Sequence, residues 1–343
     1  MLKTGKLDSD LLKQIVIDKI NYKRPEVLTR AGVGEDCAVV DYGDYECVMS
    51  TDPITAAVSD IGRLAIHISC NDIASNGIQP LGIMLAVMLP VGTTEEDIEL
   101  IMDQAAKAAE ACEVEIIGGH TEITAAVNQP VIVSTAIGRG RKNQSASAEN
   151  IQIGDVILMT KSAGLEGTGI IAGDYAEELR AVLSAEELEQ ASELLDHVSV
   201  VRDGVTAGAV GTHGMHDITE GGILGAVWEM CQISHVGAEV WEDSIPILPE
   251  TEKICAHFDI NPLRLISSGS MVIIVPKEKK EEMEKAMEEA GVPASVIGII
   301  REEKEDICLI SRTETCGVEG KGRIKRKIDP PYADELYKVV GKK

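Results

Sequence analysis

The sequence predicts a mixed α+β (α/β) protein built from two domains. Apolar runs of strand length alternate with stretches of helical period in both halves of the chain. A polar stretch without period separates the halves at residues 139–153. With 343 residues the chain is too long for one ordinary hydrophobic core. We therefore expect an N-terminal domain over residues 1–140, a C-terminal domain over 151–315 and a tail over 316–343.

The first half contains the elements of an α+β domain. We expect helices over 7–20, 61–76 and 93–111, and strands over 38–40, 47–50, 81–89, 114–117 and 131–138. The helix at 61–76 has an apolar stripe of residues three and four apart and ends before Gly77 and Pro80. Thr93 and Glu96 form a capping box for the helix that runs to about residue 111.

The second half repeats the mixture of strands and helices. We expect strands over 156–160, 238–241, 271–275, 295–300 and 307–310. Helices are expected after a glycine-rich turn at 164–169, over 185–196 and 223–231, near residue 253, and over 277–290. The segment 321–327 is basic, and we expect it to be mobile.

Composition limits the classes of function. Apolar residues make up 44% of the chain but aromatic residues only 3%, so the core is aliphatic. The net charge of −25 argues against a nucleic-acid partner, because such proteins present basic faces. A nucleotide can still enter an acidic site as its Mg²⁺ complex. Eight cysteines without a Cys-x-x-Cys pair, and no leader or long apolar span, predict reduced thiols in a cytoplasmic protein without a membrane partner.

Three aspartates stand where a metal site could form. Asp72 follows the apolar stripe of its helix, and a carboxylate there is costly unless something pairs with it. A helix end whose acid faces water would explain Asp72 alone. Other acids occur at matching places, Asp36 in a glycine-spaced turn and Asp52 just past a strand, so we interpret Asp72 as one of a set of acids that holds a metal ion. Asn71, beside Asp72, would then face a phosphate.

Other motifs are weak when taken singly. Gly118 and Gly119 after a strand suggest a phosphate contact, because bare backbone N–H groups can approach an anion. Lys161 could reach a phosphate, although a lysine at a strand end is usually solvated. His213 and His216 could bind a metal, but oxygen donors dominate the other candidate sites, which argues against zinc.

Taken in order, the motifs resemble the aminoimidazole ribonucleotide (AIR) synthetase-like, or PurM-like, superfamily. They are Gly32-x-Gly34-Glu35-Asp36, Thr51-Asp52, Asp60-Ile61-Gly62, Asn71-Asp72-Ile73-Ala74-x-x-Gly77-x-x-Pro80, Gly118-Gly119-x-Thr121 and His216-Asp217-x-Thr219-x-Gly221-Gly222. The superfamily includes AIR synthetase, thiamine-monophosphate kinase, selenophosphate synthetase and the hydrogenase-maturation protein HypE. The resemblance covers roughly residues 30–310.

The resemblance implies a two-domain subunit whose N-terminal domain forms a dimeric β-barrel and whose C-terminal domain is an α/β sandwich. It implies ATP and Mg²⁺ as cofactors and transfer of the γ-phosphoryl group to an oxygen, or another nucleophile, of the substrate. The resemblance implies Asp36, Asp52 and Asp72 as magnesium ligands, and Asp217, from the second domain, as a catalytic residue. Residues around the nucleotide would be Asn71, Asp72, Gly118, Gly119, Thr121 and Gly221. His120 is a further candidate catalytic residue, at a position where the chain departs from the family pattern.

Departures from the superfamily patterns indicate which branch of the superfamily this chain resembles. His120 replaces an aspartate common in the kinase and HypE members. It could donate to a phosphate or carry a proton, or simply hydrogen-bond across its loop. Residues 1–21 contain no cysteine, which argues against selenophosphate synthetase. The last cysteine is Cys316, so the terminal thiol of HypE is missing. We place the chain in a HypE-like group without that cysteine.

The leading hypothesis is a homodimeric ATP- and Mg²⁺-dependent enzyme that phosphorylates an oxygen of a small amide, carboxylate or phosphate substrate. Cyclo-ligase, dehydratase and phosphotransferase reactions all fit this description. One alternative is a small-molecule kinase similar to thiamine-monophosphate kinase. Another is a nucleotide-binding maturation or scaffold protein that acts on a partner protein. The sequence does not identify the acceptor, which could be a small molecule or a protein.

Overall fold

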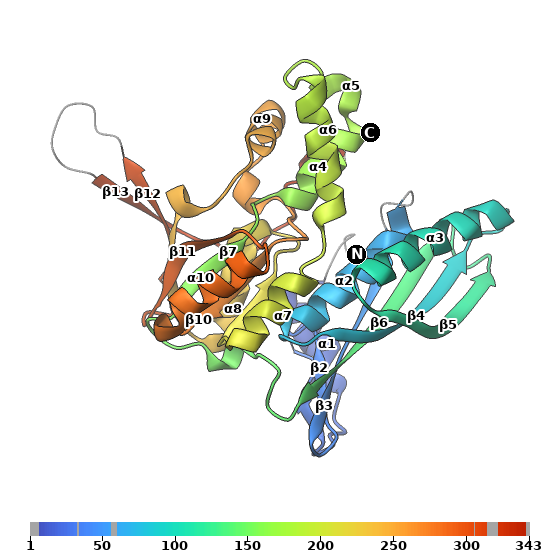
Figure 1. Ribbon diagram of the computed structural model, residues 1–343, viewed down its shortest axis with the longest axis horizontal. Coiled ribbons are helices and arrows are strands. Elements are labelled where there is room, and N and C mark those ends of the chain that lie inside the picture. The colour runs from blue at the N-terminus through green and yellow to red at the C-terminus, as the bar shows by residue number, and fades with distance from the viewer. Residues whose placement is uncertain (1–6, 33, 56–59, 305, 314–321, 341–343) are drawn as a thin grey trace. The chain divides into compact units, whose positions relative to one another are not determined.

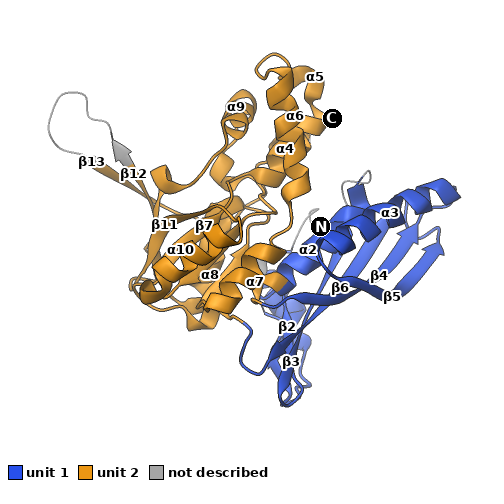
Figure 2. Cartoon of the chain, in the orientation of Figure 1, with its two compact units in different colours: residues 1–73, 78–145 blue, residues 74–77, 146–343 orange. Residues whose placement is uncertain are grey.

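The computed structural model describes residues 7–32, 34–55, 60–304, 306–313 and 322–340. The chain divides into two compact units (Figure 2): unit 1 comprises residues 1–73 and 78–145, and unit 2 comprises 74–77 and 146–343. Each unit contains its own β-sheet and helices. The predicted two-domain α+β fold is therefore confirmed.

Unit 1 is built on a six-stranded sheet with the order β1-β2-β3-β6-β4-β5 (Figure 1). The strands are β1 (Val27–Thr29), β2 (Ala38–Asp41), β3 (Tyr45–Ile54), β4 (Pro80–Leu89), β5 (Glu115–Ile123) and β6 (Val131–Arg141). All neighbouring pairs are antiparallel except β4 and β5, which run parallel. The crossover between these two is the helix α3 (Glu95–Ala111).

Two helices, α2 (Ile61–Ser75) and α3, pack with one face of this sheet. Alternate residues of β6, among them Ile132 and Ala136, point toward the helices and are fully buried. Gly62 allows α2 to approach α3, because a Cβ there would lie 2.1 Å from the carbonyl oxygen of Ile101. This helix-covered face is the core of unit 1.

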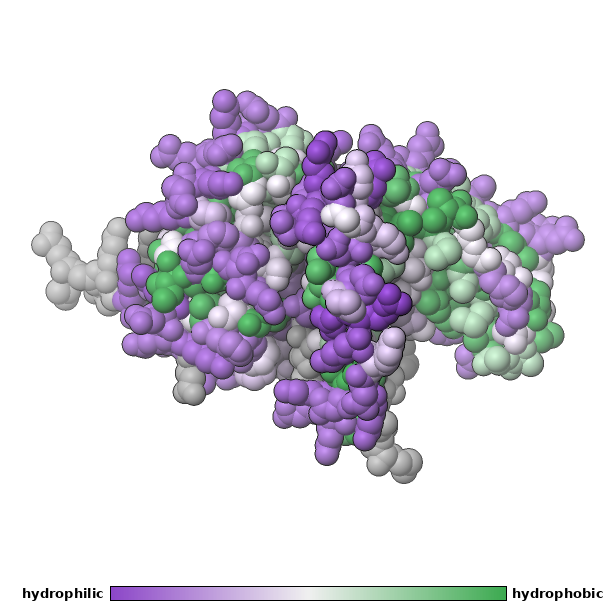
Figure 3. Space-filling view, turned by 90° about the horizontal axis from the view of Figure 1, so that it is seen from below, coloured by the Kyte–Doolittle hydropathy of each residue, from purple (hydrophilic) through white to green (hydrophobic). Residues whose placement is uncertain are grey.

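The opposite face of the unit 1 sheet is open in the described structure. Val131, Val133 and Ile137 of β6 alternate with the buried residues and are only half-buried. Leu81 and Met84 of β4 are 55% and 44% exposed. Figure 3 shows apolar side chains gathered on the side of the molecule where this sheet lies. Unit 1 therefore presents an apolar sheet face to its surroundings.

Several predicted boundaries in unit 1 were wrong. The first helix is shorter than expected, with α1 at Ser9–Ile15 and a 3₁₀ turn at Ile17–Lys19. The capping box of α3 uses Thr94 and Asp97, one position later than predicted. β3 continues past Asp52, and β5 continues through the glycine pair to Ile123. Strand pairing to β6 and β4 therefore extends both strands beyond their predicted ends.

Unit 2 is built on a seven-stranded sheet with the order β13-β12-β9-β11-β7-β10-β8. The strands are β7 (Val156–Thr160), β8 (Gly214–Asp217), β9 (Gly237–Trp241), β10 (Met271–Val275), β11 (Ala294–Arg301), β12 (Ile307–Thr313) and β13 (Gly322–Lys327). Only the pair of β9 and β12 is parallel. Residues 322–327 of the basic segment that was expected to be mobile form strand β13, paired with β12, so the prediction was wrong for these residues. Lys321 lies outside the described residues.

Helices lie on both faces of the central strands of unit 2. Ile157 and Met159 face the helix α8 (Gly222–Ser234), whereas Val156 and Leu158 belong to a second cluster. That second cluster includes residues of α7 (Val201–Val210) and α10 (Lys280–Glu289). Because helices cover both faces of the sheet here, β7 and β10 are buried at every position. Strands buried in this way have nearly continuous apolar sequences.

The remaining helices of unit 2 form a third cluster with the end of the chain. They are α4 (Leu165–Asp174), α5 (Ala176–Leu179), α6 (Ala185–Glu193), α9 (Pro249–Phe258) and α11 (Tyr337–Val340). Leu336 and Val339 pack in this cluster beside Ile171 and Ile254. Residues 328–340 are therefore part of unit 2.

Two further expectations can be compared with the described residues. No disulfide bond joins the seven cysteines that the structure describes, and all but Cys47 are buried. Their burial agrees with the prediction that the cysteines belong to the core, whereas their reduced state stays a prediction. Within the described parts of the chain, no helix is both long and apolar enough to cross a membrane.

Candidate functional site

Asp72 is buried within helix α2, in unit 1. Its exposed fraction is only 5%, although a buried carboxylate needs compensation. The Ser50 hydroxyl donates a hydrogen bond to Asp72 Oδ2 over 2.5 Å. The thiol of Cys37 lies 3.3 Å from the main-chain oxygen of Asp72 and donates to it. Asp72 is therefore an internal acid held by β3 and by the segment before β2, not a helix end facing water.

Asp52 lies two residues after Ser50 on β3, so both side chains point to the same face of the sheet. The Ser50 hydroxyl oxygen is 3.4 Å from Asp52 Oδ2. The carboxylate oxygens of Asp52 and Asp72 are thus at most about 6 Å apart, since one oxygen lies 3.4 Å from the first and 2.5 Å from the second. Two of the three predicted metal ligands meet around one hydroxyl group.

Asp36 immediately precedes Cys37, whose thiol binds the main chain of Asp72. The Asp36 side chain is exposed, in contrast to Asp72. In unit 1, Asp52 and Asp72 are therefore joined through Ser50, and Asp36 is next in sequence to a residue that contacts Asp72. The oxygen donors present there fit Mg²⁺, which prefers carboxylate oxygens. Asn71 is fully buried beside Asp72 in α2.

The predicted phosphate-binding residues Gly118, Gly119 and Thr121 lie within β5, the edge strand of the sheet. Gly119 is required for packing, because a Cβ there would lie 1.9 Å from the carbonyl oxygen of Leu85. A Cβ at Gly118 would meet no atom within 4 Å. Strands β6 and β4 separate β5 from β3, so unit 1 does not bring these residues to the carboxylates.

His120 is exposed on β5. Its Nε2 lies 3.3 Å from Oε2 of Glu122, two residues along the same face of the strand. This contact is a local hydrogen bond, the simplest of the roles considered for His120. Glu122 was missed in the sequence, because an acid two residues after a histidine is common and signals nothing without the knowledge that both lie in a strand.

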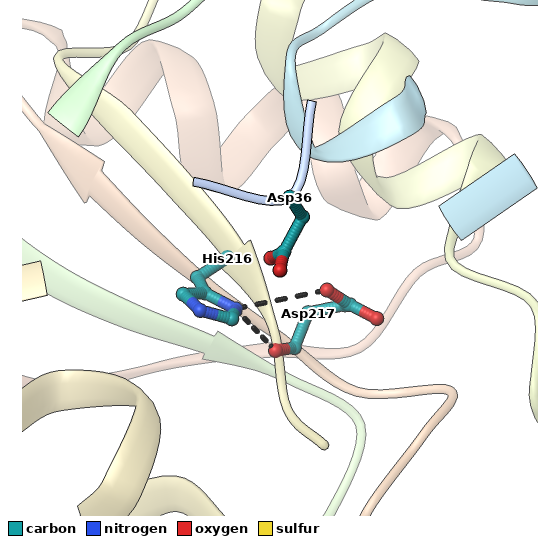
Figure 4. A group of neighbouring side chains, drawn as sticks. All are labelled: Asp36, His216 and Asp217. Atoms are coloured by element: carbon teal, nitrogen blue, oxygen red, sulfur yellow. Dashed lines mark hydrogen bonds and ion pairs between the residues drawn. The ribbon is translucent and has the colours of Figure 1, made fainter. Parts of the chain in front are cut away.

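His216 and Asp217 end strand β8 of unit 2 (Figure 4). The Nδ1–H of His216 donates to the main-chain oxygen of Asp217 over 2.6 Å, and Nδ1 is 3.6 Å from Asp217 Oδ1. On its other side, His216 Nε2 is 3.5 Å from Glu229 of α8. Asp217 is 1% exposed, and its Oδ2 is among the few described buried atoms without a hydrogen-bond partner. Such an atom is rare in native structures and calls for an explanation, such as a bound water, a bound ion or a catalytic role.

Gly221 precedes helix α8 with a positive φ of 89°, a backbone conformation that favours glycine. Its N–H donates to Asp334 Oδ2 over 2.8 Å. Asp334 Oδ1 also accepts from the N–H groups of Ile266 and Leu336, at 3.2 and 2.9 Å. Burial raises the pKa of the Asp334 carboxyl, and these three N–H donors oppose that effect. The predicted nucleotide-binding N–H of Gly221 therefore contacts an acid from the end of the chain.

Glu166 is a buried acid of unit 2 that the sequence analysis did not single out. It lies in the first turn of α4, inside what was predicted to be a glycine-rich turn. Burial raises the pKa of Glu166, Ser268 opposes this by hydrogen bonding, and the charges of Asp334 and Asp217 raise it further. Its Oε2 has no hydrogen-bond partner among the described residues. No sequence signal distinguished this glutamate from an ordinary acid at a helix start.

Lys161 has a structural role that differs from both predicted ones. Its Nζ donates to Asp203 Oδ1 at 3.0 Å and to the main-chain oxygens of Ser199 and Gly269 at 2.9 and 2.6 Å. Asp203 is 1% exposed. The ammonium group is therefore fully engaged inside unit 2 and is neither a solvated lysine nor a free phosphate ligand.

Comparison with known proteins identifies the family. Residues 34–140 match the N-terminal domain of AIR synthase related proteins, and residues 152–310 match their C-terminal domain. The chain belongs to the AIR synthase related family. The resemblance predicted from the motifs is confirmed by these matches.

Relatives within this family are hydrogenase-maturation proteins. The chain is 28% identical to a putative hydrogenase expression/formation protein of Methanocaldococcus jannaschii over 98% of this chain and 97% of that protein. It is 29% identical to the carbamoyl dehydratase HypE of Bradyrhizobium diazoefficiens over 71% of each.

Solved structures show the same fold. A HypE–HypF complex structure matches with a TM-score of 0.74 and 22% identity, over 94% of this chain and 99% of that one. HypE in complex with ATP matches with a TM-score of 0.66 and 21% identity, over 97% of both chains.

Proposed function

We propose that this protein is an ATP- and Mg²⁺-dependent enzyme of the HypE type that phosphorylates an oxygen of a small amide, carboxylate or phosphate substrate. The observation that carries the proposal is the pair of carboxylates, Asp52 and Asp72, gathered around the Ser50 hydroxyl. Two acids this close repel each other unless a cation or a proton lies between them. Support comes from the HypE relatives and from the fold shared with HypE in complex with ATP.

In this proposal Asp36, Asp52 and Asp72 hold Mg²⁺, which would neutralise charge on the nucleotide phosphates. Asn71, Gly118, Gly119, Thr121 and Gly221 contact the nucleotide. Asp217 and His120 act on the reacting groups. The open backbone around Gly118 suits a phosphate contact. At Gly221 the nucleotide would compete with the Asp334 carboxylate for one N–H.

We also propose that the protein is a homodimer joined through the open face of the unit 1 sheet. Met84 and Met88 of β4 lie opposite Thr135 and Val131 of β6 on this face, so the apolar surface is continuous across strands. A second copy of the same face would cover it. Light scattering on the purified protein should give twice the chain mass, whereas a monomer at micromolar concentration would contradict this part of the proposal.

A partner protein is the second candidate for the acceptor, and the likeness to a HypE–HypF complex favours it. The experiment follows the γ-phosphate of radiolabelled ATP with candidate amides, carboxylates and carbamoylated partner proteins. Release of free phosphate that depends on an acceptor supports the activating enzyme. A stable phosphorylated product indicates a small-molecule kinase instead. ATP binding with no turnover under any condition, together with a stable partner complex, would support a scaffold and contradict the enzyme.

A further inference from the structure

We propose that Ser50 is a positioning residue that holds Asp52 and Asp72 ready for a divalent cation. The inference rests on the proposed metal-dependent function and concerns a residue outside the predicted ligand set. Ser50 lies on β3 in unit 1 and is 4% exposed. Its hydroxyl contacts the side chains of both aspartates, one from its own strand and one from helix α2.

The hydroxyl group has one proton for two carboxylates. At 2.5 Å from Asp72 Oδ2, that proton is donated to Asp72. At 3.4 Å, the contact of the same hydroxyl group with Asp52 Oδ2 is much weaker, because one proton cannot be donated fully to both carboxylates. The arrangement leaves an excess of negative charge between the two acids, and a cation bound there would neutralise it. Ser50 therefore fixes the acids without satisfying both of them.

Fixing one oxygen of Asp72 determines where the other points. Because Oδ2 accepts the Ser50 proton, rotation of the carboxylate is restricted and Oδ1 is presented in one direction. Cys37 restrains the same residue from its main chain, through the thiol contact to the Asp72 carbonyl oxygen. Hydrogen bonds to ligating carboxylates orient them, and losing such a bond typically weakens metal binding 10- to 100-fold.

The test compares Ser50→Ala with Ser69→Ala. Ser69 is also fully buried, on the same helix as Asp72, but its hydroxyl pairs with Ser134 at 2.8 Å and not with a carboxylate side chain. Each variant loses one buried hydroxyl group, so both should lower the melting temperature, Ser50→Ala by more because its hydrogen bond is to a carboxylate. Binding of Mn²⁺ alone is measured from the loss of the free-ion signal in electron paramagnetic resonance.

We expect the dissociation constant for Mn²⁺ to rise about 10- to 100-fold in Ser50→Ala and less than about twofold in Ser69→Ala. Ser50→Thr, which keeps the hydroxyl group, should restore most of the affinity. Unchanged affinity in Ser50→Ala, or an equal loss in both alanine variants, would overturn the positioning role while leaving the metal site in place. A wild-type protein that binds no Mn²⁺ would overturn the proposed metal-dependent function and, with it, the role of Ser50.

Discussion

Replacing Lys161 with methionine should destabilise unit 2 strongly. The Lys161 ammonium group is the ionic partner that the structure gives to the buried carboxylate of Asp203, with contacts of 3.0 and 3.1 Å to its two oxygens. Removing one member of a buried ion pair typically costs about 3–5 kcal/mol, because the other charge remains buried without compensation. Lys161→Met also removes the donors to the carbonyl oxygens of Ser199 and Gly269, so we expect the upper part of this range.

Tryptophan fluorescence during urea unfolding measures this effect. The protein has two tryptophans, Trp228 on α8 and Trp241 on β9, and both lie in unit 2. With an m-value of about 2 kcal/mol/M, a loss of 3–5 kcal/mol lowers the urea midpoint by about 1.5–2.5 M.

A matched lysine on the surface provides the control. Lys285 pairs with Glu289 at 3.6 Å, and both side chains are mostly exposed. Lys285→Met should change the free energy of unfolding by no more than about 0.5 kcal/mol, as is usual for exposed ion pairs. If Lys161→Met loses less than about 1 kcal/mol, or no more than the control does, the buried ion pair is not a main support of unit 2 and the reasoning is refuted.

Two further predictions concern Gly119 and Glu166. Gly119→Ala should disrupt the pairing of β5 with β4, because the added Cβ would lie 1.9 Å from the Leu85 carbonyl oxygen and residue 119 has a φ of 149°. The hydrogen-exchange rates of the β5 backbone amides should therefore increase. Unchanged protection of these amides would contradict the prediction. Burial raises the pKa of Glu166, so the folded state holds this proton to higher pH than the unfolded state does. The contribution of the Glu166 carboxyl to the free energy of unfolding therefore falls as pH rises above about 4.5 and through the folded-state pKa. Glu166→Gln should remove that loss and make unit 2 more stable than wild type at pH 8, whereas a pH profile parallel to wild type would contradict the assignment.

The sequence predicted best which face of a helix a residue lies on. The apolar stripe of α2 placed Asp72 on its buried side, and the structure confirms an internal acid that needs compensation. Helical period is readable locally, because side chains three and four apart share one face. The sequence could not reveal Ser50, because a serine in a strand is ordinary until tertiary packing brings α2 against β3.

The errors at β5 and β13 share a physical cause. Both are edge strands of their sheets, and the glycine pair in β5 and the basic residues in β13 are unfavourable in a strand by propensity. Pairing with β4 and with β12 overrides that propensity. At Gly119 the close approach of Leu85 even requires glycine, so the residue that predicted a loop is part of the strand.

The roles of Glu166 and Asp334 also depend on contacts distant in sequence. Asp334 reaches Gly221, more than one hundred residues earlier, and Glu166 is bonded to Ser268. Neither contact leaves a pattern in the sequence, whereas Gly221 itself belonged to a recognisable motif. Motifs therefore predicted candidate site residues in each unit, but they did not indicate Glu166 or Asp334.

Calorimetric titration of ATP, with and without Mg²⁺, tests whether Asp52 and Asp72 belong to a metal–nucleotide site. The variants are Asp72→Asn and a control, Asp103→Asn, which removes the same charge from an exposed position on α3. We predict Mg²⁺-dependent binding that is at least about tenfold weaker in Asp72→Asn, or about 1.4 kcal/mol, and unchanged in the control. Equal binding by all three proteins, or binding that does not require Mg²⁺, would contradict a metal–nucleotide site built on Asp52 and Asp72.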